Sequence, residues 1–378
     1  MHSFYRLVTL FVFVSTLISC VKKAEPNFII EGSISPLKGG TITLLKEIDI
    51  ERKLSEKIDV INLSKEGGFE KGYSSGPGLY RLQLNKKKSL LLAIDTGQHI
   101  KIKITDLNSG NLNISILGST DSEVLLDYEN FRKKSLDSLV QSVRRQVREV
   151  KKGANPDQDK IKELQQLEIE NYAIHLKELN KFVKNNMNNT LGLYATSIRW
   201  KGAENLNLYD SLTKAFERAN PDLELTKKLR EKVSRLQQTS IGGIVPDIEM
   251  KTQKGKAISL SSIQKKYTLI DFWASWCGPC RSESNTLNDL YEKYNVKGFE
   301  IYGVSLDDKE EKWLKAIEKD NRTWTNVSSL QGFKTPASYD YAVTALPDNY
   351  LIDAKRKIIA KNIHGEKLIT LIDSLLND

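Results

Sequence analysis

The feature that most constrains this chain is a pair of cysteines, Cys277 and Cys280, at the end of an apolar run. The run, residues 267–273, predicts a buried strand, and the amphipathic stretch 287–294 after the cysteines predicts a helix. Two thiols at a strand-to-helix turn can close a small disulfide ring. The first thiol also lies where unpaired N–H groups and the helix dipole stabilise a thiolate. The pattern is typical of thiol–disulfide exchange.

Two other uses of the cysteine pair fit the sequence poorly. A zinc site needs four ligands, but the only other cysteine is Cys20 and His364 stands alone near the C-terminus. A purely structural disulfide is also disfavoured, because a strand-to-helix turn needs no staple. We therefore expect no metal and no cofactor beyond a redox-active disulfide between Cys277 and Cys280.

The residues around the pair carry a family resemblance. Asp271-Phe272-Trp273-Ala274 followed by Cys-Gly-Pro-Cys resembles thioredoxin. The motifs at 281–283, 303–307 and 346–353 are similar to the TlpA/ResA-like, membrane-tethered branch of the thioredoxin superfamily, over roughly residues 241–378. Peroxiredoxins share this fold, but they carry Thr three residues before the peroxidatic cysteine, where this chain has Ala274.

The resemblance implies a role for each residue at the dithiol. Cys277, partly exposed, would attack a substrate disulfide, and Cys280 would resolve the mixed disulfide. Asp271 matches the buried acid of thioredoxin and would accept the proton of Cys280, with a pKa raised by burial. Glu283 matches the acid of TlpA/ResA-like proteins and is expected to be the wetter of the two. A solvent-facing Asp271 and an ordinary surface Glu283 are the plainer alternatives.

The same resemblance predicts a substrate-docking surface. Leu346 and Pro347 match the cis-proline loop, whose backbone pairs with an extended substrate segment by strand addition. The Trp276 indole would belong to the same apolar surface, unless it serves only in packing. Two positions depart from the family pattern. Asn285 replaces a proline, which puts a helix kink in doubt, and residues 355–356 replace a glycine, which puts a turn type in doubt.

The N-terminus predicts a targeting segment. Arg6 precedes an apolar stretch, residues 7–18, that is short for a membrane span. Residues 17–20, Leu-Ile-Ser-Cys, resemble the bacterial lipobox, in which Cys20 is lipidated and becomes the first mature residue. We therefore expect a signal peptide at 1–19, a tether at 20–27 and a lipid-anchored protein on the periplasmic side of the cell envelope, in the inner or outer membrane. An unlipidated signal peptide and a retained membrane anchor are the alternatives.

The rest of the chain divides by its periodicity into three parts. Residues 28–118 alternate as half-buried strands and resemble the small antiparallel β domain that often precedes TlpA-like domains. Residues 119–240 predict helices that form a hairpin or small bundle. Residues 241–378 predict a mixed sheet covered by helices, giving an α/β fold with a C-terminal thioredoxin fold. The strands are expected at 28–30, 41–45, 79–84, 90–94, 100–104, 299–305, 350–353 and 357–360, and the helices at 120–152, 157–188, 206–219, 222–238, 310–320 and 367–376.

Composition and motifs together predict an enzyme rather than a binder of nucleic acid. The net charge of +9 is spread along the chain, and its basic runs lack the interleaved aromatic residues of a stacking surface. The Gly-Pro pair between the cysteines matches thioredoxin and favours a reductant of protein disulfides, supplied with electrons by a membrane thiol donor. A disulfide isomerase or oxidant is one alternative. A client- or glycan-binding lipoprotein with an accessory redox domain is another.

Overall fold

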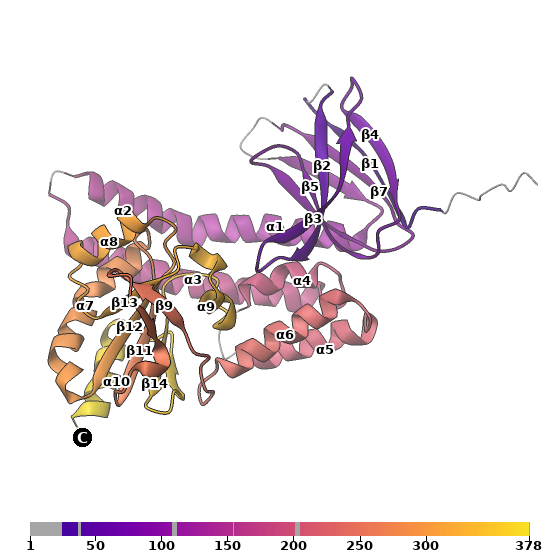
Figure 1. Cartoon of the computed structure of the whole chain (residues 1–378). Coiled ribbons are helices and arrows are strands. Elements are labelled where there is room, and N and C mark those ends of the chain that lie inside the picture. The colour runs from indigo at the N-terminus through magenta and orange to yellow at the C-terminus, as the bar shows by residue number, and fades with distance from the viewer. Residues whose placement is uncertain (1–24, 37–38, 108–111, 154, 201–204, 378) are drawn as a thin grey trace, which may run out of the picture.

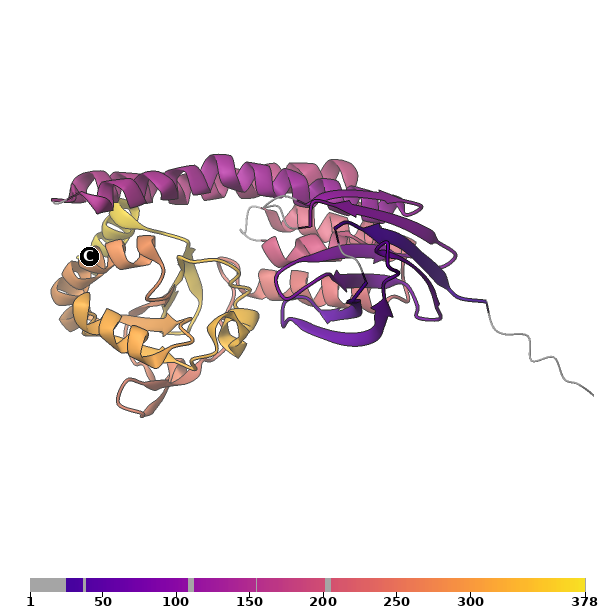
Figure 2. The same cartoon turned by 90° about the horizontal axis from the view of Figure 1, so that it is seen from above.

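The structure, a computed structural model, describes residues 25–36, 39–107, 112–153, 155–200 and 205–377. Figure 1 shows a β-sandwich, a set of long helices and a C-terminal α/β part. Seen from above in Figure 2, the long helices run along one side of both other parts. The predicted fold class, an α/β chain with a C-terminal thioredoxin-like fold after a β domain and a helical segment, is confirmed.

The β-sandwich consists of two four-stranded sheets, in the orders β4-β1-β7-β8 and β3-β2-β5-β6. Strand β7 shows why this sequence forms a sandwich, because Ile100, Ile102 and Ile104 are buried while the intervening lysines are exposed. All pairs are antiparallel except β1 with β7, which run parallel. The strands are β1 (Phe28–Ile34), β2 (Thr41–Asp49), β3 (Leu54–Asn62), β4 (Gly68–Tyr73), β5 (Gly78–Gln83), β6 (Ser89–Ile94), β7 (His99–Thr105) and β8 (Asn113–Leu117).

The helical segment begins and ends its helices close to the predicted breaks. Ser119 caps the first helix by accepting from the Ser122 amide, and Asp157 caps the longest one by accepting from the Lys160 amide. One turn, Asp137–Gln141, is a π-helix between α1 and α2. The helices are α1 (Thr120–Leu136), α2 (Ser142–Lys152), α3 (Gln158–Asn186), α4 (Leu193–Thr196), α5 (Leu206–Ala219) and α6 (Glu224–Gln238).

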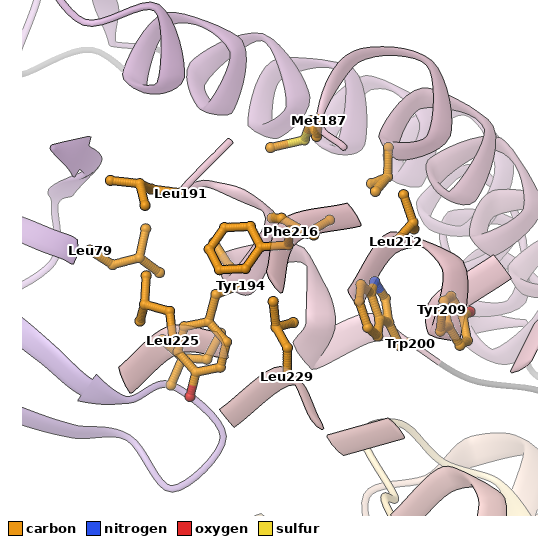
Figure 3. Close-up of a cluster of buried hydrophobic side chains, with 14 of the residues drawn as sticks. Leu79, Met187, Leu191, Tyr194, Trp200, Tyr209, Leu212, Phe216, Leu225 and Leu229 are labelled. Atoms are coloured by element: carbon orange, nitrogen blue, oxygen red, sulfur yellow. The ribbon is translucent and has the colours of Figure 1, made fainter. Parts of the chain in front are cut away.

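One buried apolar cluster joins the helices to the parts on either side. Within it, the rings of Trp200 and Tyr209 stack with centroids 4.7 Å apart. Figure 3 shows both residues among the side chains of this cluster. Leu79 of the sandwich and Ala342 of the C-terminal part belong to the same cluster. Ion pairs add to this connection. Glu51 of the sandwich pairs with Lys232 and Arg235 of α6, and Arg235 donates to the Tyr339 hydroxyl of the C-terminal part at 2.7 Å.

The C-terminal part is built around a seven-stranded mixed sheet in the order β10-β9-β13-β12-β11-β14-β15. The central strand β11 is parallel to β12 and antiparallel to β14. One face of β11 packs Leu269 against residues of α7 and α10, and the other packs Phe272 against Tyr341. The elements are β9 (Glu249–Thr252), β10 (Ala257–Ser259), β11 (Tyr267–Trp273), α7 (Gly278–Tyr294), β12 (Phe299–Ser305), α8 (Glu310–Lys319), β13 (Thr325–Ser328), α9 (Pro336–Asp340), β14 (Asp348–Asp353), β15 (Ile358–Lys361) and α10 (Gly365–Leu376).

Both departures from the family pattern have a structural outcome. Helix α7 continues without a break through Asn285 to Tyr294. In the β14–β15 hairpin, Arg356 adopts a left-handed backbone conformation with φ of 62°. Glycine adopts this conformation without strain, which explains why it is the usual residue in this turn. An arginine there raises the conformational energy of the turn.

Candidate active site

The dithiol lies where the sequence predicts, at the start of α7 and directly after β11. Cys277 and Cys280 form a disulfide with their Cα atoms 5.3 Å apart. Cys277 is the N-cap of α7, and its sulfur lies 3.2 Å from the Cys280 amide, which donates to it. Pro279 occupies the first turn, where its missing N–H costs no helical hydrogen bond. The helix N-terminus therefore faces the sulfur that is expected to become a thiolate.

The loop before Cys277 is held by two charged side chains. The buried carboxylate of Asp307, just after β12, accepts from the Ser275 amide at 2.9 Å and from its hydroxyl at 2.6 Å. Arg281 donates to the Ser275 carbonyl at 3.1 Å and pairs with Asp320 at the end of α8. Two neighbouring elements thus fix the loop, so the cysteines are presented in one geometry.

Asp271 lies on β11 behind the dithiol and is 3% exposed, so the alternative of a solvent-facing carboxylate is wrong. Its partner is Arg322, a fully buried residue that the sequence analysis did not identify. Arg322 donates to Asp271 at 3.0 Å, to the Cys280 carbonyl at 3.0 Å and to the Ser284 hydroxyl at 3.0 Å. Its guanidinium also lies over the Trp273 ring, 3.8 Å from the centroid. One guanidinium therefore connects the buried acid to the backbone of the second cysteine.

The electrostatics of this pair follow from its burial. Complete burial raises the pKa of Asp271, and the charge of Arg322 offsets this only in part. Burial likewise lowers the pKa of Arg322, although the Asp271 charge opposes the change. A carboxyl group with a raised pKa can hold or release a proton nearer neutrality than an ordinary aspartate.

Glu283 is also largely enclosed, which excludes the alternative of an ordinary surface charge. The Glu283 side chain is 11% exposed and that of Asp271 is 4% exposed. Glu283 is therefore the more solvent-exposed of the two acids, as predicted, but the difference is small. Glu283 pairs with His364 at 2.8 Å and accepts from the Gly365 amide at 3.2 Å. Burial lowers the pKa of His364, but the hydrogen bond and charge of Glu283 outweigh it, and the net direction is upward. His364, which looked isolated in the sequence, thus belongs to this site.

The residues that the resemblance predicts to dock a substrate lie beside the disulfide. The Leu346–Pro347 peptide bond is cis, as the resemblance implied, and Leu346 packs against the buried cluster that contains both cysteines. Trp276 is 56% exposed, and its ring centroid lies 6.1 Å from that of Phe333. A pure packing role for Trp276 is therefore excluded, and an apolar surface is available next to Cys277.

One expectation about the dithiol is wrong. Cys277, expected to be partly exposed, is 5% exposed. Leu330 and Leu346 pack against the cluster that contains it. Helix α3 also approaches closely, because a Cβ added at Gly278 would lie 3.1 Å from the Gln165 side-chain nitrogen. Gly278 thus permits a contact between the helical segment and the redox motif that no local pattern in the sequence signals.

The remaining predictions concern the N-terminus, metal binding and the membrane. Cys20 and the signal peptide lie outside the described residues. Within the described part of the chain, no group of three or more His, Cys, Asp or Glu side chains is placed to bind a metal ion. No helix among those same residues is long and apolar enough to cross a membrane.

Comparisons with known proteins find relatives of the C-terminal part of the chain. The AhpC/TSA family model matches residues 241–361. The thiol-disulfide oxidoreductase ResA of Bacillus cereus is 33% identical over 131 residues, which are 35% of this chain and 73% of that protein. The crystal structure of a thioredoxin domain from a Bacteroides vulgatus thiol-disulfide oxidoreductase is 36% identical and covers 36% of this chain and 99% of its own, with a TM-score of 0.35. A Bacteroides fragilis thiol-disulfide oxidoreductase is 34% identical over 35% of this chain and 99% of its own, with a TM-score of 0.34.

Proposed function

Because this chain belongs to the ResA family of thiol-disulfide oxidoreductases, we propose that it reduces protein disulfides outside the cytoplasm, with Cys277 as attacking thiol and Cys280 as resolving thiol. The observation that carries the proposal is the Cys277–Cys280 disulfide at a helix N-terminus with Asp271 buried behind it. The residues that dock the substrate are Trp276, Leu346 and Pro347. No cofactor beyond the disulfide takes part.

The reaction follows from these positions. In the reduced enzyme, the Cys277 thiolate attacks one sulfur of the substrate disulfide, and the other substrate sulfur leaves as a thiolate that takes up a proton. Cys280 then loses its proton to Asp271 and attacks the Cys277 sulfur, which releases the second substrate thiol and closes the enzyme disulfide. Two electrons and two protons from a membrane thiol donor restore the dithiol.

The reducing direction is supported by Gly278 and Pro279, the same pair that separates the cysteines of thioredoxin, whose potential is about −270 mV. The test is reduction of insulin by the purified chain supplied with dithiothreitol. We expect insulin to precipitate faster than with dithiothreitol alone. Faster refolding of a scrambled disulfide protein without net reduction would instead identify an isomerase. A client-binding lipoprotein with an accessory redox domain is less well supported, because the full set of dithiol, buried acid and cis-proline loop is present.

We expect the two acids to differ in their effect on the second step. Asp271→Asn should slow resolution of the mixed disulfide by about 10²-fold and leave the first attack nearly unchanged, because it removes the proton acceptor behind Cys280. Glu283→Gln should slow resolution less than about tenfold, because Glu283 is engaged by His364. Stopped-flow fluorescence of each half-reaction measures both rates.

Asp289→Asn is the matched control, since Asp289 is an exposed carboxylate on the same helix α7. It should alter neither half-reaction. A larger effect of Glu283→Gln than of Asp271→Asn on resolution would reverse the two roles. The chain would then transfer the proton through Glu283, as its TlpA/ResA-like relatives are expected to do.

The location of the protein is a further part of this proposal. Cys20 would carry the lipid that anchors the chain to the periplasmic face of a membrane after removal of residues 1–19, with residues 20–27 as tether. The β domain at 28–118 and the helical region at 119–240 would then separate the anchor from the redox domain at 241–378.

The substitution Cys20→Ser should remove the lipid anchor. We expect Cys20→Ser protein to stay unprocessed or to leave the membrane fraction, because the lipid is attached to that sulfur. Mass spectrometry of the wild-type N-terminus should find a lipid-modified Cys20 as the first residue. An unmodified mature chain that begins at another residue would refute lipidation without affecting the redox proposal.

A further inference from the structure

The helical segment lies directly against the redox motif. Gln165 of α3 is 4% exposed, and its side-chain oxygen accepts a hydrogen bond from Ser282 of α7, in the turn after Cys280. Its side-chain nitrogen approaches Gly278, the residue after Cys277. The last turn of α2, with Lys151, and the first turns of α3, residues 158–165, therefore form a wall beside the dithiol. Trp276 lines the same hollow as this wall, so a substrate bound at Trp276 lies near it.

Two hollows flank this contact, and their charges differ. The first, of about 740 Å³, lies between the wall and Trp276, and it includes Lys151 and Lys162 of the wall and Lys319 of α8. We call it the lysine cleft. The second hollow, of about 760 Å³, lies on the other side of Gln165 and is mainly acidic. It includes Glu163, Glu170, Glu283 and Glu366. The exposed docking residue Trp276 borders only the first of these two hollows.

The lysine cleft keeps an excess of positive charge, although Lys162 and Asp159 line the acidic hollow as well. Lys151, Lys162 and Lys319 are exposed, and no ion pair involves them in the part of the chain that the structure describes. Arg281 and Asp320, which also border the cleft, pair with each other. Asp159 is the one remaining carboxylate of the lining, so three lysines face one acid. Such a patch attracts negative charge and raises the association rate of an oppositely charged partner.

We propose that the lysine cleft binds an acidic segment of the substrate, so that the preferred substrates are polypeptides with acidic residues next to the disulfide. This inference rests on the proposed function. A substrate segment seated on Trp276 and the Leu346–Pro347 loop presents its disulfide to Cys277. Its flanking residues then extend past Trp276 into the cleft, where carboxylates meet the three lysine ammonium groups. The helical segment is therefore part of the specificity of the redox site.

The test uses the whole chain in its reduced form and three synthetic disulfide-linked peptides of equal length, with glutamate, lysine or serine around the cysteine. The second-order rate of reduction is measured at low salt by tryptophan fluorescence. We expect the acidic peptide to react at least about tenfold faster than the basic one, and the difference to shrink as salt is added. A ratio near one, or a preference for the basic peptide, would overturn the proposal.

Charge reversal locates the effect. In the variant Lys151→Glu, Lys162→Glu, Lys319→Glu, the acidic-to-basic ratio should fall below one. The matched control reverses three exposed lysines of the β-sandwich, Lys57, Lys65 and Lys103, and should keep the wild-type ratio despite the same change in net charge. Equal ratios in the two variants would contradict a role for the cleft. The milder variant with glutamine at the same three cleft positions should bring the ratio close to one, and an unchanged ratio there would also count against the cleft.

The serine peptide separates this inference from the proposed function. Its rate should be the same in the wild type and in the β-sandwich control variant, and in each cleft variant it is the reference against which the rates of the two charged peptides are expressed. Failure of every peptide to react would refute the disulfide-reducing function itself, whereas equal rates for all three peptides would refute only the acidic preference. Reversal of the cleft lysines could slow the reduction of oxidised glutathione while leaving the acidic-to-basic peptide ratio unchanged. That result would show that the cleft selects a small acidic disulfide, and it would overturn the proposal of a polypeptide substrate.

Discussion

The Cys277→Ser protein is expected to reduce insulin no faster than dithiothreitol alone. Serine keeps the shape of the side chain and can still cap α7, but its hydroxyl stays protonated at neutral pH and cannot form a disulfide. The measurement is the rate of insulin precipitation at several enzyme concentrations. The dependence of the rate on enzyme concentration should disappear, and not merely weaken.

Cys20→Ser provides the matched control for this substitution. It removes the one cysteine outside the dithiol, and the purified protein should reduce insulin at the wild-type rate. Activity that persists in Cys277→Ser protein, or that is lost in Cys20→Ser protein, would contradict the assignment of the attacking thiol.

Arg322→Ala is expected to lower the free energy of unfolding of the C-terminal part by about 3–5 kcal/mol at neutral pH, because it leaves Asp271 buried without its partner. The measurement is a urea titration followed by tryptophan fluorescence. Trp200 is the only tryptophan outside residues 241–378, so the signal reports mainly on the part that contains Arg322. Lys293→Ala is the control. It breaks an exposed pair with Asp373 in the same C-terminal part and should cost far less stability than Arg322→Ala.

The loss caused by Arg322→Ala should depend on pH with a definite sign. The folded-state pKa of Asp271 is already raised by burial and should rise further without Arg322. A group that holds its proton more tightly in the folded state makes the folded state less stable as pH rises. The loss should therefore be small below about pH 4, the ordinary pKa of aspartate, and should grow above it. Adding Asp271→Asn to the Arg322→Ala protein should recover part of the lost stability. A loss of stability that is independent of pH, or as small as that of Lys293→Ala, would contradict the buried pair.

The parts of the site that the sequence predicts are those encoded within a few residues. The strand before Cys277 follows from its apolar run, and the cis bond before Pro347 follows from a motif. The pairing of Asp271 with Arg322 joins residues 51 positions apart, and that of Glu283 with His364 joins residues 81 apart. No local pattern encodes such contacts, so the partners of both acids appear only when β11, α7 and the segments around 322 and 364 are packed together.

The same reasoning explains the missed elements and the wrong exposure of Cys277. Strand β3 (Leu54–Asn62) is mostly exposed and polar, so its sequence lacks the alternation that identified β7. The strands β4, β8 and β13 were missed because their apolar pattern is weak. Two of the six residues of β4 are glycines, β8 has a single buried residue, and β13 has a single aliphatic side chain. Cys277 belongs to a buried cluster that includes Trp313 and against which Leu330 and Leu346 pack, and all three are distant from it in sequence. The local motif therefore determines the position of Cys277 on the helix but not its exposure.

The central claim, that Cys277 attacks and Cys280 resolves, is tested most directly by mapping the trapped intermediate. Reduced Cys280→Ser protein is mixed with a disulfide-linked peptide, quenched with acid and digested, and the adduct is located by mass spectrometry. The account predicts a stable mixed disulfide between the peptide and Cys277. An adduct on another residue, or no adduct from a protein whose wild type reduces the same peptide, would contradict it.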